Sequence, residues 1–319
     1  MKLYVGLSPY WQLGSKASEL AIYYYDKLFC LWTHALFSYY YVKDFEKWME
    51  VAAVKTDVSL VDIMLDSGAF SIWSTGGEID LAEYTKYAVH LQEINSFKNL
   101  AVVSLDKIPG SRSKITTRAM ILAAANESFK NYMFMCERGL RNVIAVYHLG
   151  EPLSCLKRFL DEGADYIGLG GIARGVGSGA RRQWLDGVFS FLKQHSLSVR
   201  VHGFGVTAID LIMRYPWYSV DSVTPMLAPG LGNVSVFDEA HKKVRNIYVQ
   251  GIAVDKQIFL SDQAFLEARF GVPFKDLTML WCRRYFTQVE WLKFIAWLNQ
   301  KDGSMIQKVL QPSLGLNDL

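Results

Sequence analysis

The sequence has few cysteines, and none of them lie close together. The four are Cys30, Cys136, Cys155 and Cys282, with no C-x-x-C spacing among them. Zinc sites built on thiolates usually carry such pairs, so this kind of site has no local signature in the chain. Isolated thiols are typical of a reducing compartment, where they act as small buried hydrophobic groups. We therefore expect a cytoplasmic protein without a structural metal site.

The chain also lacks long apolar runs and a strong excess of one charge. No stretch approaches the roughly 18 apolar residues of a membrane-spanning helix. The first residues, MKLYVGLSPYWQ, have neither the apolar core nor the cleavage site of a secretory signal. The net charge is only +3, so no global basic field marks a nucleic-acid-binding protein, although a local basic patch is compatible with it. We expect a soluble protein with no membrane partner.

Short β-branched and aromatic runs alternate with helical stretches along most of the chain. The expected strands cover residues 3–7, 36–42, 62–66, 100–106, 143–148, 166–170, 199–203 and 219–223. Helical periodicity is found in residues 82–94, 114–132, 152–162, 181–195 and 208–213. The alternation predicts an α/β fold with a parallel sheet. Eight strands favour a closed TIM (β/α)8 barrel over an open doubly wound sheet.

After Val249 the pattern changes to a tail rich in Trp, Phe and Leu. These residues recur at helical spacing, as in Trp291, Phe294, Ile295 and Leu298. A barrel routinely uses roughly 250 residues as one domain. We therefore predict a catalytic barrel over residues 1–249 and a helical C-terminal extension over residues 250–319 that packs on it. The alternative is that the apolar tail forms the surface of a homodimer.

Polar residues and glycines recur at the C-terminal ends of the expected strands. Asp66 lies in LDSGAFS, Asp106 in VVSLDKIPG and His148 in VIAVYHLGE. The next three strand ends carry Gly170 and Gly171 in YIGLGGIARG, His202, Gly203 and Gly205 in VHGFGV, and Asp221 in SVDSVTP. In a TIM barrel these ends open into one shared pocket, where catalysis takes place. Their repeated placement predicts a single active site.

Each of these residues also has a structural explanation when it is taken alone. An Asp before Ser-Gly is often a turn former or a helix N-cap, and this alternative is open for Asp66, Asp106 and Asp221. His148 and His202 are compatible with hydrogen-bonded core histidines, and the glycines with tight turns. The placement of all of them at strand ends is what favours a shared site.

The ordered set of motifs resembles the tRNA-guanine transglycosylase superfamily. It is most similar to the DpdA-like branch, which places 7-deazaguanine bases into DNA. DSGAF at residues 66–70 is similar to the family's DSGGF, and SLD ending at Asp106 is similar to its ALDE segment. YIGLGGIARG is similar to YAIGGLAVG, and HGFGV followed by VDSVTP is similar to MGVG followed by FDCVLPTR. The resemblance runs from Asp62 to Pro225 and implies a TIM barrel that exchanges bases.

The resemblance implies catalytic roles for three aspartates. Asp221 matches the family's nucleophile, Asp66 its general acid/base, and Asp106 the carboxylate that reads the guanine edge. A carboxylate can attack the anomeric carbon of a sugar while a second carboxyl group supplies the proton that the leaving base needs. Two acids in one partly desolvated pocket can have their pKa values pushed apart, which suits this division of labour.

The resemblance also implies the walls of a base pocket. Phe70 would stack on the base, His202 would form the opposite wall, and Gly171 would contact the base through its backbone. His148 stands where the family usually has a base-binding Gln. The further expected substrate contacts are Ser67, Gly170 and Gly203.

Basic residues in two loops of the catalytic face are candidate phosphate contacts, with a solvated loop as the alternative for each. They are Arg112 after the fourth strand and Arg174, Arg181 and Arg182 in GIARGVGSGARR after the sixth. The tRNA enzymes carry a CxCxxC…H zinc subdomain and basic residues after their LPT motif. This chain lacks that cysteine pattern, so we predict no structural zinc. It has MLAPGLG after Pro225, which favours DNA or another polymer over tRNA. Lys107 stands where the family usually has an acidic residue.

The sequence thus predicts a transferase that replaces guanine in DNA with a 7-deazaguanine such as preQ0. The reaction would pass through a covalent aspartyl-glycosyl intermediate and would need no metal or redox cofactor. One alternative is the same exchange on tRNA. A second is an N-glycoside hydrolase that uses the same carboxylates and releases the base to water. A third is a non-catalytic barrel that binds a nucleic acid or a partner subunit.

Overall fold

Eight parallel strands close into a barrel, in a computed structural model that describes residues 1–110, 116–172, 177–195, 198–250 and 260–300. Each strand pairs with the next along the chain, and β8 pairs with β1. The strands are β1 (Lys2–Gly6), β2 (His34–Ser38), β3 (Asp62–Asp66), β4 (Asn99–Val103), β5 (Val143–His148), β6 (Tyr166–Gly170), β7 (Arg200–Gly203) and β8 (Ser219–Ser222). The predicted TIM barrel is confirmed, and the open sheet is excluded.

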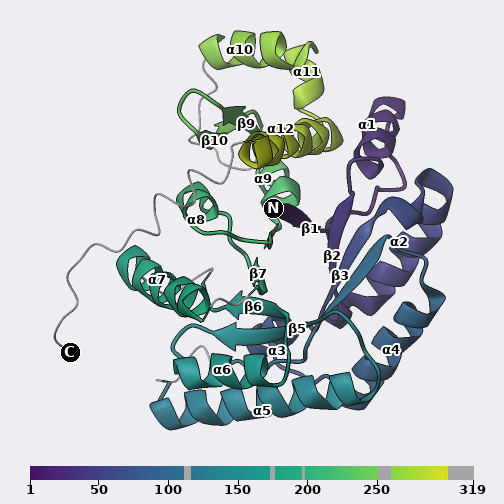
Figure 1. The fold of residues 1–319 in the computed structure, drawn as a ribbon. Helices are drawn as coiled ribbons and strands as arrows, with labels where there is room; N and C mark the ends of the chain where they lie inside the picture. The colour runs from purple at the N-terminus through teal and green to yellow at the C-terminus, as the bar shows by residue number, and fades with distance from the viewer. Residues whose placement is uncertain (111–115, 173–176, 196–197, 251–259, 301–319) are drawn as a thin grey trace.

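Helices surround the strands (Figure 1). They are α1 (Glu19–Phe29), α2 (Val42–Lys55), α3 (Ala69–Thr75), α4 (Leu81–Ile94), α5 (Arg118–Glu137), α6 (Leu153–Asp161), α7 (Ser178–Gln194), α8 (Ile209–Arg214) and α9 (Thr224–Gly230). Three of them begin at capping side chains that accept a hydrogen bond from the first turn. These caps are Ser18 of α1, Asp80 of α4 and Thr117 of α5.

The strand boundaries agree best where a β-branched run stops at a polar or glycine residue. Residues 62–66, 143–148 and 166–170 are strands as predicted. The prediction of a strand over 36–42 is wrong beyond Ser38, because Tyr39–Tyr41 form a 3-10 turn and Val42 begins α2. The fourth strand ends at Val103, so Asp106 lies in the loop that follows it rather than at its last position.

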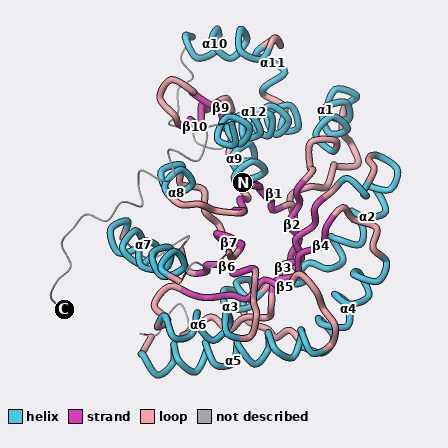
Figure 2. Tube along the Cα trace, viewed as in Figure 1, coloured by secondary structure: helices cyan, strands magenta, loops and turns pink. Residues whose placement is uncertain are grey.

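Alternation along the strands separates two apolar clusters, because successive side chains point to opposite faces of a sheet. One cluster fills the barrel interior and consists of Tyr4, Met64, Ala101, Val103, Ile144, Val146 and Tyr166. The other set of strand side chains, including Val5, Ile63 and Leu169, packs against the surrounding helices. Figure 2 shows this two-layer arrangement, with the strands inside the ring of helices.

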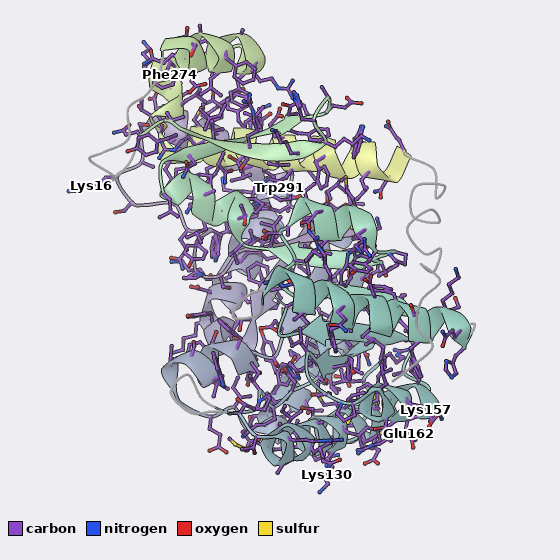
Figure 3. All side chains as sticks on the ribbon, turned by 90° about the vertical axis from the view of Figure 1, so that its left-hand side faces the viewer. Lys16, Lys130, Lys157, Glu162, Phe274 and Trp291 are labelled. Atoms are coloured by element: carbon purple, nitrogen blue, oxygen red, sulfur yellow. The ribbon has the colours of Figure 1, made fainter. Side chains whose placement is uncertain are left out.

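The chain after β8 adds a hairpin and three helices. Strands β9 (Asn233–Asp238) and β10 (Lys243–Tyr248) pair in antiparallel fashion, and α10 (Leu260–Phe270), α11 (Phe274–Leu277) and α12 (Leu280–Gln300) follow. Sequence reasoning missed the hairpin, which packs against α12. Helix α12 lies against α1 and α9, with Trp291 buried where it meets the rest of the molecule (Figure 3). The described part of the tail is therefore helical and packs on the helices around the barrel through α12, while the predicted domain bounds of 1–249 and 250–319 stay a prediction.

Candidate active site at the carboxyl ends of the strands

Strand alternation selects which side chains reach the interior of the barrel. Met64 and Val146 are interior residues, so Asp66 and His148, two positions further on, point the same way. Asp221 is in register with Tyr4, another interior residue, and His202 is in register with Ser219, two positions before Asp221. The predicted residues Asp66, His148, His202 and Asp221 thus face one region at the carboxyl ends of the strands.

Among the acids of this region, Asp66 has the surroundings that most disfavour a negative charge. Its Oδ2 accepts a hydrogen bond from the backbone N–H of Gly68 at 3.1 Å. Burial raises the pKa of Asp66 to about 7, with further contributions from the negative charges of Asp106 and Asp221. The three aspartates therefore act on one another, and Asp66 can hold a proton near neutral pH.

Asp221 is held by two donors on one of its oxygens. The backbone N–H of Gly205 donates to Oδ1 at 2.7 Å, and Nε2 of His202 lies 3.2 Å from the same atom. The Asp221 side chain is 14% exposed, so it is accessible from the mouth of the barrel. Because both bonds go to Oδ1, this arrangement orients the carboxylate and leaves Oδ2 without a bond to any described residue.

A buried chain of hydrogen bonds continues below Asp221. Nδ1 of His202 lies 2.8 Å from Oγ of Ser219, which lies 2.7 Å from the hydroxyl of Tyr166. A carboxylate only accepts, so Nε2 of a neutral His202 carries the proton and Nδ1 accepts from Ser219. The set resembles a Ser–His–Asp triad, but Ser219 is fully buried. Only Asp221 reaches the mouth, so the serine cannot be the attacking group.

The structure gives His202 a different place from the one expected. Its ring is fully buried and lies against the ring of Phe204, with centroids 4.5 Å apart. The position beneath the carboxylate makes it a residue that orients Asp221, rather than an open wall of a base pocket. Phe204 is partly exposed and lies above it.

Asp106, His148 and Glu151 form a second, charged group. Nε2 of His148 lies 2.9 Å from Oδ2 of Asp106, and its Nδ1 lies 3.2 Å from Oε1 of Glu151. Both ring nitrogens face carboxylates, so both must donate and the ring is an imidazolium. Burial opposes this charge, but the hydrogen bonds to Asp106 and Glu151 outweigh it and raise the pKa of His148 to about 10.

Ser67 supports this group from below. Its Oγ donates to Oδ1 of Asp106 at 3.3 Å and accepts from the backbone N–H of Ala69 at 3.3 Å. Ser67 is fully buried. The predicted substrate contact therefore lies behind Asp106 and fixes the orientation of that carboxylate.

The predicted glycines differ in what they make room for. A Cβ on Gly170 would lie 2.6 Å from Cδ2 of His148, so this glycine gives space to the imidazolium. A Cβ on Gly203 would lie 2.7 Å from a methyl group of Val206 and 2.9 Å from the ring of Trp217. Gly203 thus serves the packing between barrel and helices. Gly171 has φ +77° and is exposed in the loop after β6.

Aromatic side chains surround the mouth near Asp66. Phe70, in the first turn of α3, is 53% exposed, and its ring centroid lies 5.9 Å from that of Trp73. Tyr40, in the turn after β2, is exposed and its hydroxyl lies 3.2 Å from Oγ1 of Thr75 in α3. Phe70 therefore presents an open face next to the strand that carries Asp66, and its expected stacking role stays a prediction.

The four arginines expected to bind phosphate have separate outcomes. Arg112 and Arg174 lie outside the described residues. Arg181 lies in the first turn of α7 and, with Gly205, lines a hollow of about 30 Å³ next to the loop that binds Asp221. Arg182 is exposed and its Nη2 lies 2.6 Å from Oδ2 of Asp210, which ties it to α8.

Sequence reasoning missed three residues that hold this site, and it missed the contact that a fourth residue makes. Ser219 and Tyr166 could have been found from strand alternation, since they share the interior face with Asp221 and Gly170. Gly205 was noted as part of a motif, but its N–H bond to Asp221 needs the folded loop. Glu151 stands three residues after His148, and no pattern in the sequence marks it as a partner of the histidine.

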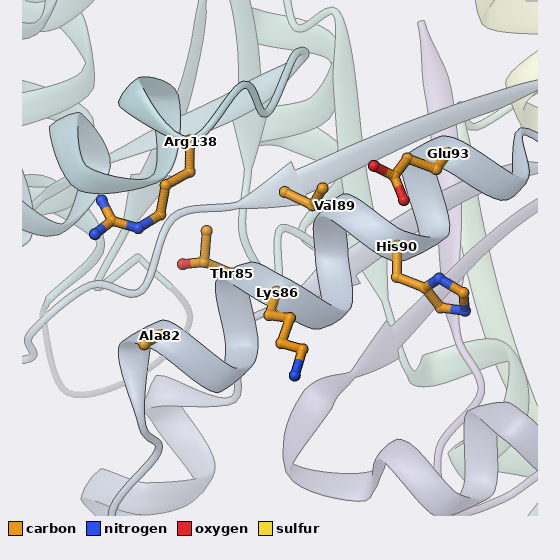
Figure 4. A pocket seen from close by; sticks show the side chains of 7 residues that line it. All are labelled: Ala82, Thr85, Lys86, Val89, His90, Glu93 and Arg138. Carbon is orange, nitrogen blue, oxygen red and sulfur yellow. The ribbon is translucent and has the colours of Figure 1, made fainter.

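A larger hollow lies elsewhere, on the outer surface along α4. It has a volume of about 500 Å³ and is lined by Ala82, Thr85, Lys86, Val89, His90, Glu93 and Arg138 (Figure 4). None of these residues belongs to the strand-end group. In the part of the chain that the structure describes, no cluster of three or more His, Cys, Asp or Glu side chains is arranged to hold a metal ion.

Neither a protein-family model nor a curated protein sequence matches the chain. Across the described residues, no helix combines the length and the apolar character needed to cross a lipid bilayer.

Proposed function

We propose that this barrel exchanges a base at an N-glycosidic bond, replacing guanine in DNA with a 7-deazaguanine such as preQ0. The observation that carries the proposal is the unequal pair Asp66 and Asp221. One carboxyl group has its pKa raised to about 7 and can hold a proton. The other is oriented by Gly205 and His202 and has a free oxygen. Such a pair can act on the two sides of one sugar–base bond.

The first step forms a covalent intermediate. Oδ2 of Asp221 attacks C1′ of the target nucleotide, and an O–C1′ bond forms as the C1′–N9 bond breaks. The departing guanine takes the electron pair of that bond, and the proton of Asp66 neutralises it. The N–H groups that bind Oδ1 keep the carboxylate fixed for the attack. The carboxylate therefore has little orientational freedom left to lose during the step.

The second step reverses the first with another base. The carboxylate of Asp66 now takes a proton from a ring N–H of the incoming 7-deazaguanine. The nitrogen attacks C1′, the bond to Asp221 breaks, and that carboxylate recovers its electron pair. Asp66 ends protonated and Asp221 ionised, so the enzyme returns to its starting state without an oxidant, a reductant or a metal.

Base recognition is assigned to Asp106 with its partners. A carboxylate can accept hydrogen bonds from the N1–H and the exocyclic amine of guanine or a 7-deazaguanine, a donor pair that adenine lacks. Ser67 and His148 hold one oxygen each of Asp106, which fixes its plane. The charge of His148 places a cation beside the position expected for the 6-oxo group. Phe70 offers a stacking face worth roughly 1–3 kcal/mol per base.

DNA is preferred over tRNA as the polymer. The segment after β8, MLAPGLG, contains no basic residue, although the tRNA enzymes grip their substrate there according to the resemblance. A base in a duplex must leave the stack to reach acids that lie inside the mouth of a barrel. The substrate would therefore be single-stranded or flipped.

The test is incorporation of labelled preQ0 into DNA by the purified chain, read by mass spectrometry of the released nucleosides. We expect a labelled deazaguanine nucleoside with the wild-type protein and none with Asp221→Ala. Release of free guanine without any added base would instead identify an N-glycoside hydrolase. Absence of both products, or the same products from Asp221→Ala, would reject the proposal.

A further inference from the structure

Two polar side chains on α12 are buried from water, but some of their polar atoms have no hydrogen-bond partner among the described residues. Arg284 and Gln288 are one turn apart, so they share a face of the helix. Arg284 is 6% exposed and Gln288 only 1%. Arg284 donates through Nε to the carbonyl of Met226 at 3.3 Å, and no carboxylate or second acceptor among the described residues reaches its guanidinium. Oε1 of Gln288 is buried without a hydrogen bond in the same set.

A buried guanidinium without an anion is costly to the fold. Burial, together with the positive charge of Arg283, lowers the pKa of Arg284 to about 10. The ring of Trp281 lies 4.5 Å from the guanidinium carbon and supplies a cation–π contact. That contact does not use the N–H groups, of which an arginine has five. Four donors of Arg284 therefore have no acceptor among the described residues and can bind an anion.

The neighbouring Arg283 is also buried, but its hydrogen bonds indicate a structural role. Its guanidinium donates to the carbonyls of Pro229, Leu277 and Thr278 at 3.1, 2.8 and 2.6 Å. These carbonyls lie at the ends of α9 and α11. Arg283 thus closes two helix ends, whereas Arg284 has no comparable set of acceptors. The two residues form a matched pair for experiment.

Arg284 lies toward the same end of the barrel as the active site. Met226, its acceptor, belongs to α9, which directly follows the strand of Asp221. Tyr10, the other titratable group near Arg284, lies in the loop that follows β1 at its carboxyl end. The opposite end of α12 is at the other face of the barrel, where Asn299 bonds to Met1. Arg284 therefore lies behind the rim between β8 and β1.

We propose that Arg284 forms an anion site for a backbone phosphate of the nucleic-acid substrate, an inference that rests on the proposed function. The free guanidinium N–H groups of Arg284, with no competing carboxylate in the described surroundings, match the oxygens of a phosphate. The site lies against α9, the helix that directly follows the strand of the attacking aspartate, on the side of the barrel where a bound polymer would place the phosphates that flank its target nucleotide.

The first experiment uses inorganic phosphate as the probe. Thermal unfolding of the full chain is measured in chloride and in phosphate at equal ionic strength. We expect phosphate at tenfold above its dissociation constant to raise Tm of the wild type by about 2–4 °C more than that of Arg284→Met. The comparison cancels the general stabilisation that phosphate gives by exclusion from protein surfaces. Arg283→Met lowers Tm in both salts but keeps the phosphate shift.

The second experiment tests whether the phosphate is that of a polymer. Binding of a short single-stranded oligodeoxynucleotide is measured between 50 and 200 mM salt (about the range over which such contacts respond). Arg284→Met should reduce the slope of log K against log salt by about 0.7, the value for one phosphate contact on a single strand. Arg284→Lys keeps the charge and should keep most of the slope.

The outcomes separate this proposal from the proposed function. No phosphate shift in the wild type, or an equal shift in Arg284→Met, would overturn the anion site, and the wild-type measurement stands even if a variant fails to fold. A phosphate shift with an unchanged salt slope would overturn the assignment to nucleic acid. If Arg284→Met lowers the salt slope but the wild-type protein incorporates no base, the result would support this site and reject only the exchange reaction.

Discussion

Asp62 and Asp66 stand at the two ends of β3 in opposite electrostatic settings. Asp62 is buried, which opposes its charge, but hydrogen bonds from His34, Asn99 and Lys2 outweigh burial and hold its pKa well below the usual range. Asp66 has no cationic partner among the described residues and faces two other aspartates, so its pKa rises to about 7. One strand thus carries a permanently ionised carboxylate at one end and a proton carrier at the other.

This contrast predicts opposite effects of two matched substitutions on stability. Between its ordinary pKa of 3.8 and its folded pKa of about 7, Asp66 binds more protons in the native state. Stability therefore falls as pH rises through this window, and Asp66→Asn should raise the free energy of unfolding by about 1–3 kcal/mol at pH 8. The gain should vanish near pH 4, where the carboxyl group is protonated. Urea denaturation at several pH values measures it.

Asp62→Asn is the control for that measurement. The folded pKa of Asp62 is depressed, so its contribution is present above pH 4 and is lost as pH falls. The variant should be less stable than the wild type at pH 8, with a difference that shrinks in acid. A loss of stability for both variants at pH 8 would contradict the raised pKa of Asp66.

The pH dependence of base exchange should report the proton on Asp66. The first step needs this group protonated, so the initial rate should fall about tenfold per pH unit above pH 7. Initial rates of preQ0 incorporation between pH 5.5 and 9, about two pH units on each side of the pKa of Asp66, measure this fall in rate. A rate that keeps rising to pH 9 would exclude Asp66 as the acid of the first step.

His202 should affect the chemical step more than substrate binding. His202→Phe keeps an aromatic ring but removes the Nε2–H that lies 3.2 Å from Asp221. Loss of one hydrogen bond to a charged group is worth about 1.5–3 kcal/mol, so kcat should fall about 10- to 150-fold. KM should change little, because the ring is buried away from solvent. Steady-state kinetics separates the two, and a change confined to KM would reject the orienting role.

Gly170 should tolerate no added methyl group. A Cβ there would lie 2.6 Å from the ring of His148, which is held on both sides by carboxylates and cannot move away. We expect Gly170→Ala to cost about 1–3 kcal/mol of stability. Gly187 in α7 has open space around it, so Gly187→Ala should add about 0.5–1 kcal/mol. Equal effects of the two substitutions in chemical denaturation would contradict this account.

Local sequence pattern was sufficient to locate the eight barrel strands and the face on which Asp66 and Asp221 lie. Residues 62–66, 143–148 and 166–170 are β-branched or aromatic runs that stop at Asp, His or Gly. A period of two then decides which side chains enter the barrel. Tyr39–Tyr41 misled the same reasoning, because aromatic residues favour strands while the chain turns there to begin α2.

The sequence by itself determined the barrel and the strand-end positions of Asp66 and Asp221, because strand periodicity and strand-end chemistry are local properties of the chain. Only the tertiary structure decided which neighbours each group meets. The pairing of His148 with Glu151, the bond from His202 to Asp221 and the single described acceptor of Arg284 depend on how the chain folds around each group. The energy of a charge depends on its burial and on its nearest partners, and no local pattern encodes either of them.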